Sequence, residues 1–134
     1  MSQGINEKKA MDHWLESSEM DFKTMENLFK TKDYSWSLFV GHLVIEKLLK
    51  ACYIKHNHKH PLMIHNLVKL AEISGLLPNE SQKKLFTEMT SFNLSSRYDD
   101  YKKSFYVKCT PEYTKEWIKQ IKQIRKWIKE EHLK

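Results

Sequence analysis

Apolar residues recur at helical spacing along most of the chain, and no useful length of strand-like alternation interrupts them. The first such segment covers about residues 8–31, and Ser18 lies inside its apolar stripe. The members of this stripe are Met11, Trp14, Leu15, Phe22, Met25, Leu28 and Phe29. Because apolar positions three and four apart share one face of a helix, the pattern predicts an amphipathic helix here.

A second segment, WSLFVGHLVIEKLLKACYI, is apolar around most of its circumference. Either Asp33 or Ser35 can cap the beginning of this helix. A helix that is apolar all round is buried, so this segment is expected to be the central element of a bundle. Its few polar residues are therefore informative, and His42, Glu46 and Lys50 follow at steps of four on one side.

Shorter helices are expected after the loop KHNHKHPLM. Asn66 or His65 begins the segment LVKLAEIS, and Gly75 is placed to close it as a C-terminal cap. Pro78 and Asn79 begin the next helix, ESQKKLFTEMTSF. The stretch SFNLSSRYDDYKKSFY, residues 91–106, is predicted to be part loop and part helix.

The last helix, about residues 111–131, has the clearest pattern. Thr110, Pro111 and Glu112 supply a capping hydroxyl, a proline at the first helical position and an acid in the first turn. Its apolar stripe consists of Tyr113, Trp117, Ile121, Ile124 and Ile128, and the opposite stripe consists of Lys115, Lys119, Lys122, Lys126 and Lys129. The basic stripe is interpreted as a solvated face, with contact to an RNA backbone as the alternative.

These segments predict an all-α fold, a four- to five-helix up-and-down bundle. No repeat or second linker divides the chain, so residues 1–134 are expected to form one domain with its core at about 8–131. No apolar run reaches the ~20 residues of a membrane span, and MSQGINEKKAMDHW lacks the apolar core of a secretory signal. Cys52 and Cys109 cannot build a disulfide framework. A cytoplasmic protein that does not contact membranes is expected.

The charge of the chain permits acidic partners such as RNA or nucleotides. Its formal net charge is +6, and of its 23 basic residues only two are arginine. One of these, Arg97, lies among hydroxyls, carboxylates and aromatic rings. Two interpretations stay open: a loop organised by an internal pair of Arg97 with Asp99 or Asp100, or a guanidinium whose planar fork binds phosphate.

Three stretches resemble the HEPN family: HLVIEKLLKACYI on the central helix, then HNLVKLAE, then NLSSRYDD. The resemblance covers roughly Trp14 to Trp127. It implies a helical bundle, usually dimeric, from a prokaryotic cytoplasm. It also implies a minimal nucleotidyltransferase as partner, because many HEPN proteins of this size pair with such an enzyme, often as a toxin with its antitoxin. Other members of the family are metal-independent endoribonucleases that use an arginine followed, after four to six intervening residues, by a histidine.

This sequence departs from that ribonuclease motif. The places for the histidine hold Lys102, Lys103 and Ser104, and no histidine occurs between His65 and His132. Lysine titrates near pH ~10, so it is a poor proton carrier at neutral pH. Whether the protein is an enzyme is therefore left open, and the candidates for catalytic residues are Arg97, Asp100, Tyr101 and His42.

The function predicted from the resemblance is binding of nucleotide or RNA phosphate, together with a nucleotidyltransferase partner and a second copy of the chain. The predicted ligand-binding residues are Arg97, Tyr98, Asp99, Asp100, Tyr101, Glu46, His42 and Lys50. Glu46 is expected to lie opposite Arg97 and orient its guanidinium, because a polar side chain on an apolar helix needs a partner. The alternatives are a ribonuclease with a non-standard site and a degenerate dimeric scaffold. No cofactor is expected.

Two further groups of residues have ordinary explanations. His56, His58 and His60 alternate in what is expected to be an extended loop, where three imidazoles can collect a metal, but adventitious binding is favoured and no metal site is predicted. Phe92 and Phe105 are assigned to core packing or a dimer interface. For Tyr98 and Tyr101, packing and base stacking both remain open.

Overall fold

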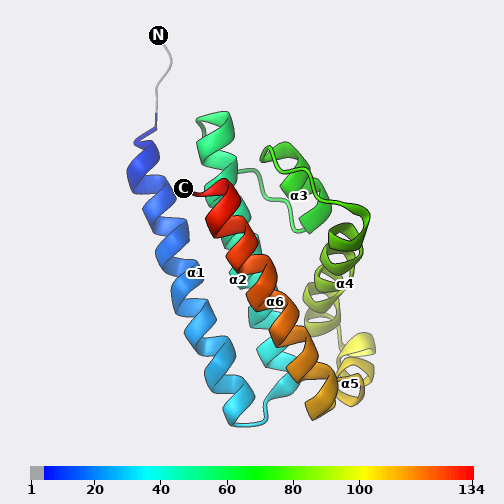
Figure 1. The fold of residues 1–134 in the computed structure, drawn as a ribbon. Coiled ribbons are helices and arrows are strands. Elements are labelled where there is room, and N and C mark those ends of the chain that lie inside the picture. Colours follow the sequence, from blue (N-terminus) through cyan, green and yellow to red (C-terminus); the bar gives the residue numbers. More distant parts are fainter. Residues whose placement is uncertain (1–4) are drawn as a thin grey trace.

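The computed structural model describes residues 5–134, and these residues form six α-helices and no strand (Figure 1). The helices are α1 (Glu7–Lys30), α2 (Tyr34–Asn57), α3 (Leu67–Ile73), α4 (Glu80–Arg97), α5 (Asp99–Lys108) and α6 (Pro111–His132). The predicted all-α bundle is therefore confirmed. Residues 1–4, which the predicted domain and the N-terminal stretch both included, lie outside the described residues.

Helix α2 is the central element, as its sequence predicts. It contacts α1, α3, α4, α5 and α6. In Figure 1 the helices α1 and α6 run side by side with α2 behind them, and α3, α4 and α5 cover the other side. Gly41 permits the close approach of α2 to its neighbours, since a Cβ there would lie 2.6 Å from Ile121 Cδ1.

The helix ends follow the capping residues that the sequence offers. The side chains of Asn66 and Thr110 accept hydrogen bonds from backbone N–H groups of the first turns of α3 and α6. Asn79 and Gln82 form a reciprocal capping box at the start of α4. Gly75 has φ +86, a left-handed conformation that suits glycine just after a helix end.

Serine hydroxyls join the two longest helices inside the core. Ser18 Oγ donates to the carbonyl of Val44 at 2.8 Å, and Ser37 Oγ donates to the carbonyl of Met25 at 2.8 Å. Each hydroxyl is buried and satisfied, so a polar residue in the apolar stripe does not destabilise the packing of α1 on α2. Ser18, which interrupts the stripe in the sequence, is thereby explained.

Residues 91–106 are more helical than the sequence suggests. Helix α4 continues through Arg97, the chain turns at Tyr98 in an extended conformation, and α5 begins at Asp99. Phe92 and Phe105 are buried with ring centroids 5.3 Å apart. The contact between these rings holds α4 and α5 together across the turn at Tyr98. Apart from Tyr98, residues 91–106 therefore belong to two helices, which brings the number of helices in residues 5–134 to six. Of the two explanations predicted for these phenylalanines, core packing is the one that the structure shows.

Helices capable of spanning a membrane do not occur within residues 5–134. The two cysteines, Cys52 and Cys109, are both buried and free. Burial raises the pKa of each thiol to about 12, so both are protonated and unreactive near neutral pH.

Candidate functional site

A buried carboxylate on α2 gathers three basic side chains. Glu46 is only 3% exposed. It accepts a hydrogen bond from Nδ1 of His65 at 2.9 Å, and its other oxygen lies 3.3 Å from Nζ of Lys50. Nε2 of His42, one turn earlier on α2, lies 3.8 Å from the carboxylate. A buried carboxylate needs such partners, because desolvation of an unpaired charge is strongly unfavourable.

His42 is completely buried beside this carboxylate. Its Nε2 lies 3.4 Å from the carbonyl oxygen of His65, and its Nδ1 has no hydrogen-bond partner among the described residues. Burial lowers the pKa of His42, and the attraction of Glu46 offsets only part of this effect. The charge of Arg97 lowers the pKa further. His42 is therefore neutral near pH 7.

His65 lies at the edge of the cluster, and its side chain is 42% exposed. The residues beside it are held in place: Ile64 and Leu67 pack on the core, and the backbone N–H of Leu67 donates to Oγ1 of Thr90 at 3.1 Å. If its Nδ1 carries the proton donated to Glu46, the Nε2 of a neutral His65 ring is left as an acceptor. A carboxylate that holds an imidazole in this way prepares it to accept a proton.

Arg97 ends α4 on the same side of the bundle. Its side chain is exposed, and Nε donates to Oδ1 of Asn93, one turn earlier, at 2.7 Å. Asn93 is itself 8% exposed and thus fixed by packing. The guanidinium of Arg97 forms no ion pair with any residue between 5 and 134. One of its five N–H donors is used by Asn93, which orients the group without neutralising it.

The predicted contact between Glu46 and Arg97 is not formed. Within residues 5–134 the ion pairs of Glu46 are those with His42, Lys50 and His65. A histidine from the loop before α3 occupies the place expected for the guanidinium. Asn93 takes the orienting role that was predicted for Glu46.

The predicted ligand-binding residues of α5 lie apart from Glu46. Asp99 pairs with Lys102 at 3.5 Å within the helix, and the expected internal pair with Arg97 does not form among residues 5–134. Tyr98 and Tyr101 are about half exposed, and Asp100 is exposed at the start of the helix. These side chains are accessible to a ligand, and no hydrogen bond or ion pair joins them to the buried carboxylate in the part of the chain that the structure describes.

Lys50 connects the cluster to α1. Its Nζ lies 3.3 Å from Glu46 and 4.7 Å from the ring centroid of Trp14. A cation over an indole ring is stabilised by the electron-rich face of that ring. The three polar residues of α2 predicted from their spacing thus share one site, in which Lys50 is engaged by protein groups on both sides.

The histidines after α2 do not form a metal site in the described residues. His56 lies in the last turn of α2, and His58 caps it in a left-handed conformation, so the predicted extended loop begins later. Nδ1 of His58 lies 2.7 Å from Glu7, and His60 lines a separate hollow beside Trp14. Between residues 5 and 134 there is no group of three side chains suited to hold a metal ion.

Two residues of the site were missed by sequence reasoning, His65 and Asn93. His65 is predicted to help begin α3, where the capping side chain is in fact Asn66. The signal for His65 was its position between Ile64 and Leu67, two apolar residues that hold the loop against the core. The signal for Asn93 was its spacing of four before Arg97 on one helix face.

Comparison with known proteins identifies a family model that matches the sequence and a solved structure with a similar fold. The family model described as HEPN domain matches residues 11–132. The crystal structure of TT1696 from Thermus thermophilus is similar, with a TM-score of 0.75 and 16% sequence identity. The similarity covers 90% of this chain and 96% of that chain, and at this identity it shows the fold alone. Among curated proteins, none matches the sequence.

Proposed function

The chain belongs to the HEPN family, and we propose that it binds phosphate groups of nucleotides or RNA at Arg97. The observation that carries this proposal is the exposed guanidinium of Arg97, which Asn93 orients and which forms no ion pair within residues 5–134. Membership of the family supports a role connected with nucleotides or RNA.

The chemistry of Arg97 suits a phosphate ligand. A guanidinium presents a planar fork that can donate two parallel hydrogen bonds to phosphate oxygens, and it stays charged at any physiological pH. The exposed rings of Tyr98 and Tyr101 follow it within four residues of the sequence and offer faces on which bases can stack. Glu46 does not compete for the guanidinium, since its partners are His42, Lys50 and His65.

The proposal includes a second copy of the chain and a minimal nucleotidyltransferase as partner, in a toxin–antitoxin-like pair. Two exposed aromatic side chains support association: Trp36 and Tyr106, 50% and 71% exposed, line the same hollow of about 370 Å³ among serines and lysines. Exposed aromatic side chains are enriched at protein–protein contacts. The protonated, buried thiols accord with the reducing cytoplasm, where we place the protein as one domain over residues 1–134.

Binding can be tested by titrating fluorescent ATP and a labelled RNA oligonucleotide with the full chain. Arg97→Ala should weaken binding at least ~10-fold, as loss of about 1.4 kcal/mol or more implies for a charge-assisted contact. Lys23→Ala removes an exposed charge from α1 and serves as the control. Equal affinity of the wild type and the Arg97 variant would contradict the proposal and leave the degenerate scaffold.

The hydrogen bond between His65 and Glu46 favours a second candidate, a metal-independent endoribonuclease. His65 Nε2 would accept the proton of a ribose 2′-hydroxyl, and the 2′-oxygen would attack phosphorus. The 5′-oxygen of the next nucleotide would leave with a proton from solvent, and a 2′,3′-cyclic phosphate would remain. Arg97 would stabilise the added charge on the phosphate oxygens. His42, the histidine that the sequence offers for this role, is fully buried and does not reach solvent.

Incubation of the protein with RNA in excess chelator tests this activity. Cleavage with cyclic phosphate ends, lost in both His65→Ala and Arg97→Ala, would support the enzyme. Cleavage that persists in His65→Ala but falls in Tyr101→Phe or Asp100→Asn would assign the proton transfer to α5 instead. Absence of cleavage together with Arg97-dependent binding would leave the binding function alone.

A further inference from the structure

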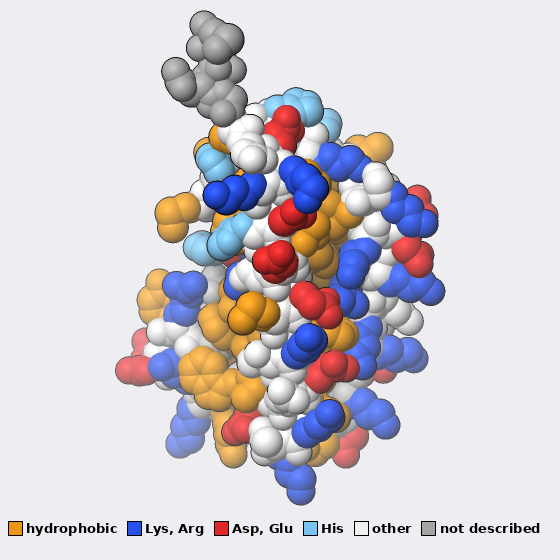
Figure 2. All heavy atoms as spheres, turned by 90° about the vertical axis from the view of Figure 1, so that its left-hand side faces the viewer, with side chains coloured by type: hydrophobic (Ala, Val, Ile, Leu, Met, Phe, Trp, Pro, Cys, Tyr) orange, Lys and Arg blue, Asp and Glu red, His pale blue; other side chains and the backbone are white. Residues whose placement is uncertain are grey.

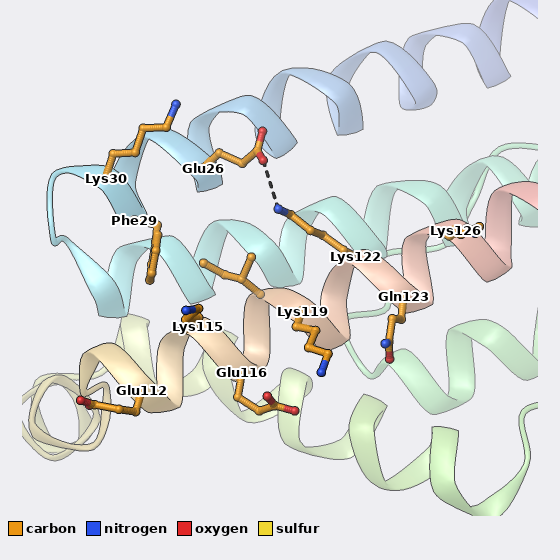
Figure 3. Close-up of a pocket in the computed structure, with 11 residues that line it drawn as sticks. Glu26, Phe29, Lys30, Glu112, Lys115, Glu116, Lys119, Lys122, Gln123 and Lys126 are labelled. Carbon is orange, nitrogen blue, oxygen red and sulfur yellow. Dashed lines mark ion pairs between the residues drawn. The ribbon is translucent and has the colours of Figure 1, made fainter.

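A groove separates α1 from α6 on the face opposite α3 and α4. Its volume is about 960 Å³, and its walls come from the last turns of α1 and the first four turns of α6 (Figure 3). The two helices are tied together by ion pairs from Glu19 to Arg125 at 2.6 Å and from Glu26 to Lys122 at 3.3 Å. Figure 3 shows α2 behind the groove and Lys122 reaching across it toward Glu26.

The floor of the groove is apolar. Phe29 of α1 is partly buried against the core, and Ile118 of α6 is 8% exposed. The methylene stems of the lysines on α6 extend this apolar surface while their ammonium groups stay in water. Figure 2, which faces the α1 side, shows apolar surface bordered on the right by a band of basic side chains.

The rim of the groove carries an excess of unpaired positive charge. Glu26 is engaged by Lys122, and Glu116 accepts a hydrogen bond from Gln120 at 3.2 Å. By contrast Lys30, Lys115, Lys119 and Lys126 line the groove and form no ion pair with any residue between 5 and 134. The solvated face predicted for α6 is exposed, and it is also one wall of this groove.

We propose that the groove receives an amphipathic helix of a partner protein, with an apolar stripe on Phe29 and Ile118 and carboxylates paired with Lys115, Lys119 and Lys126. The spacing fits such an occupant. From Lys115 to Lys126 the wall is about 16 Å long, at roughly 1.5 Å per residue, which matches about three turns of a docked helix. Helix-in-groove recognition uses apolar anchors at i, i+3, i+4 and i+7, and charges beside them set the partner.

Two other occupants fit the groove less well. A second copy packed face to face would bring the unpaired lysines of both copies together, which is unfavourable. RNA would find few hydrogen-bonding groups on the apolar floor made by Phe29 and Ile118. An acidic amphipathic helix satisfies both the apolar floor and the free ammonium groups.

The test is selection from a displayed library of random peptides, each about 18 residues or five helical turns long, against the full chain. The matched proteins are the double variant Lys115→Glu/Lys119→Glu, which reverses the rim charge, and Lys84→Glu/Lys129→Glu, which makes the same charge change outside the groove. Circular dichroism establishes that both variants are folded. Enriched peptides should carry an apolar helical stripe flanked by Asp or Glu.

The expected result is binding of these peptides to the wild type and to Lys84→Glu/Lys129→Glu with similar affinity, and at least tenfold weaker binding to Lys115→Glu/Lys119→Glu. Failure to enrich peptides above the level seen with the charge-reversed protein overturns the proposal. So does enrichment of basic peptides, displacement of the peptides by an RNA oligonucleotide, or self-association that Lys115→Glu/Lys119→Glu abolishes. Binding at Arg97 is measured separately, so the two proposals fail independently.

Discussion

The carboxylate of Glu46, nearly inaccessible to solvent on α2, accepts a hydrogen bond at 2.9 Å from His65, a residue outside any helix. This contact joins the central helix to the loop before α3. It gives the buried charge a partner, and it orients the only histidine between His60 and His132. The Glu46 cluster therefore contains a partly exposed imidazole, although the motif positions after Arg97 contain no histidine.

Replacing Glu46 should destabilise the protein. Glu46→Ala leaves Lys50 without its counter-charge and His65 without its hydrogen-bond partner, and breaking a buried ion pair from one side costs about 3 kcal/mol or more. Urea denaturation followed by circular dichroism measures the change. Glu72→Ala, which removes an exposed acid from α3, is the control and should stay within about 0.5 kcal/mol of the wild type. A wild-type unfolding curve for Glu46→Ala would refute the role assigned to this cluster.

Changing Arg97 should affect ligand binding and leave folding intact. The side chain is exposed and hydrogen bonds only to Asn93 in the part of the chain that the structure describes, so Arg97→Lys should alter the free energy of unfolding by less than about 0.5 kcal/mol. Lysine keeps the charge but loses the planar fork. Phosphate affinity in Arg97→Lys should therefore fall between those of the wild type and Arg97→Ala, which fluorescence anisotropy can measure. Full affinity in Arg97→Lys would show that charge alone suffices.

Stability should fall on mild acidification because of His42. Burial holds its folded-state pKa below 6.5, so at pH values between that pKa and 6.5 the unfolded chain binds more protons than the folded one. The free energy of unfolding then decreases as the pH is lowered through this window, with a limiting slope of about 1.4 kcal/mol per pH unit.

His42→Gln should flatten this pH dependence, whatever its effect on stability at neutral pH. The measurement is a series of denaturation curves across the range from about pH 8 to 5, in which histidine changes its charge. His13→Gln, which removes an exposed histidine from α1, is the matched variant and should retain the wild-type profile. Identical slopes for the wild type and His42→Gln would show that another group controls the acid response.

The approach of α2 to α6 at Gly41 should tolerate no large side chain. Since a Cβ alone would lie 2.6 Å from Ile121 Cδ1, Gly41→Leu should destabilise the fold by about 1–3 kcal/mol or more through overpacking. Ile121→Ala removes the opposing atoms and costs about 2–5 kcal/mol by itself. The double variant should be more stable than the sum of the two losses predicts, and additive losses would show that the two residues are not coupled.

The helices could be predicted because their signals are local. The stripe from Tyr113 to Ile128 fixes the buried face of α6, and Thr110 begins the helix as a cap in the sequence and in the structure. The region after Phe92 is where the prediction and the structure differ. Its hydroxyls and charges resemble a loop, whereas the packing of Phe92 on Phe105 extends the helical structure on both sides of Tyr98.

The site was only partly predictable. Spacing on α2 brought His42, Glu46 and Lys50 together, because residues four apart share a helix face whatever the rest of the fold does. Spacing along one helix could not identify the partner of Glu46. Arg97 and His65 were both available partners at large sequence separation, and the choice between them depends on how the loop before α3 lies against α2.

The order of residues along the chain was enough to establish an all-helical bundle with α2 at its centre and Arg97 as an unusual guanidinium, since periodicity, capping and residue type act within a few turns of helix. Three-dimensional packing alone determined that His65 and not Arg97 satisfies Glu46, and that α1 and α6 leave a lysine-rimmed groove. These contacts join elements whose relative placement is not written in any local pattern, and their geometry follows from the way whole helices fit together.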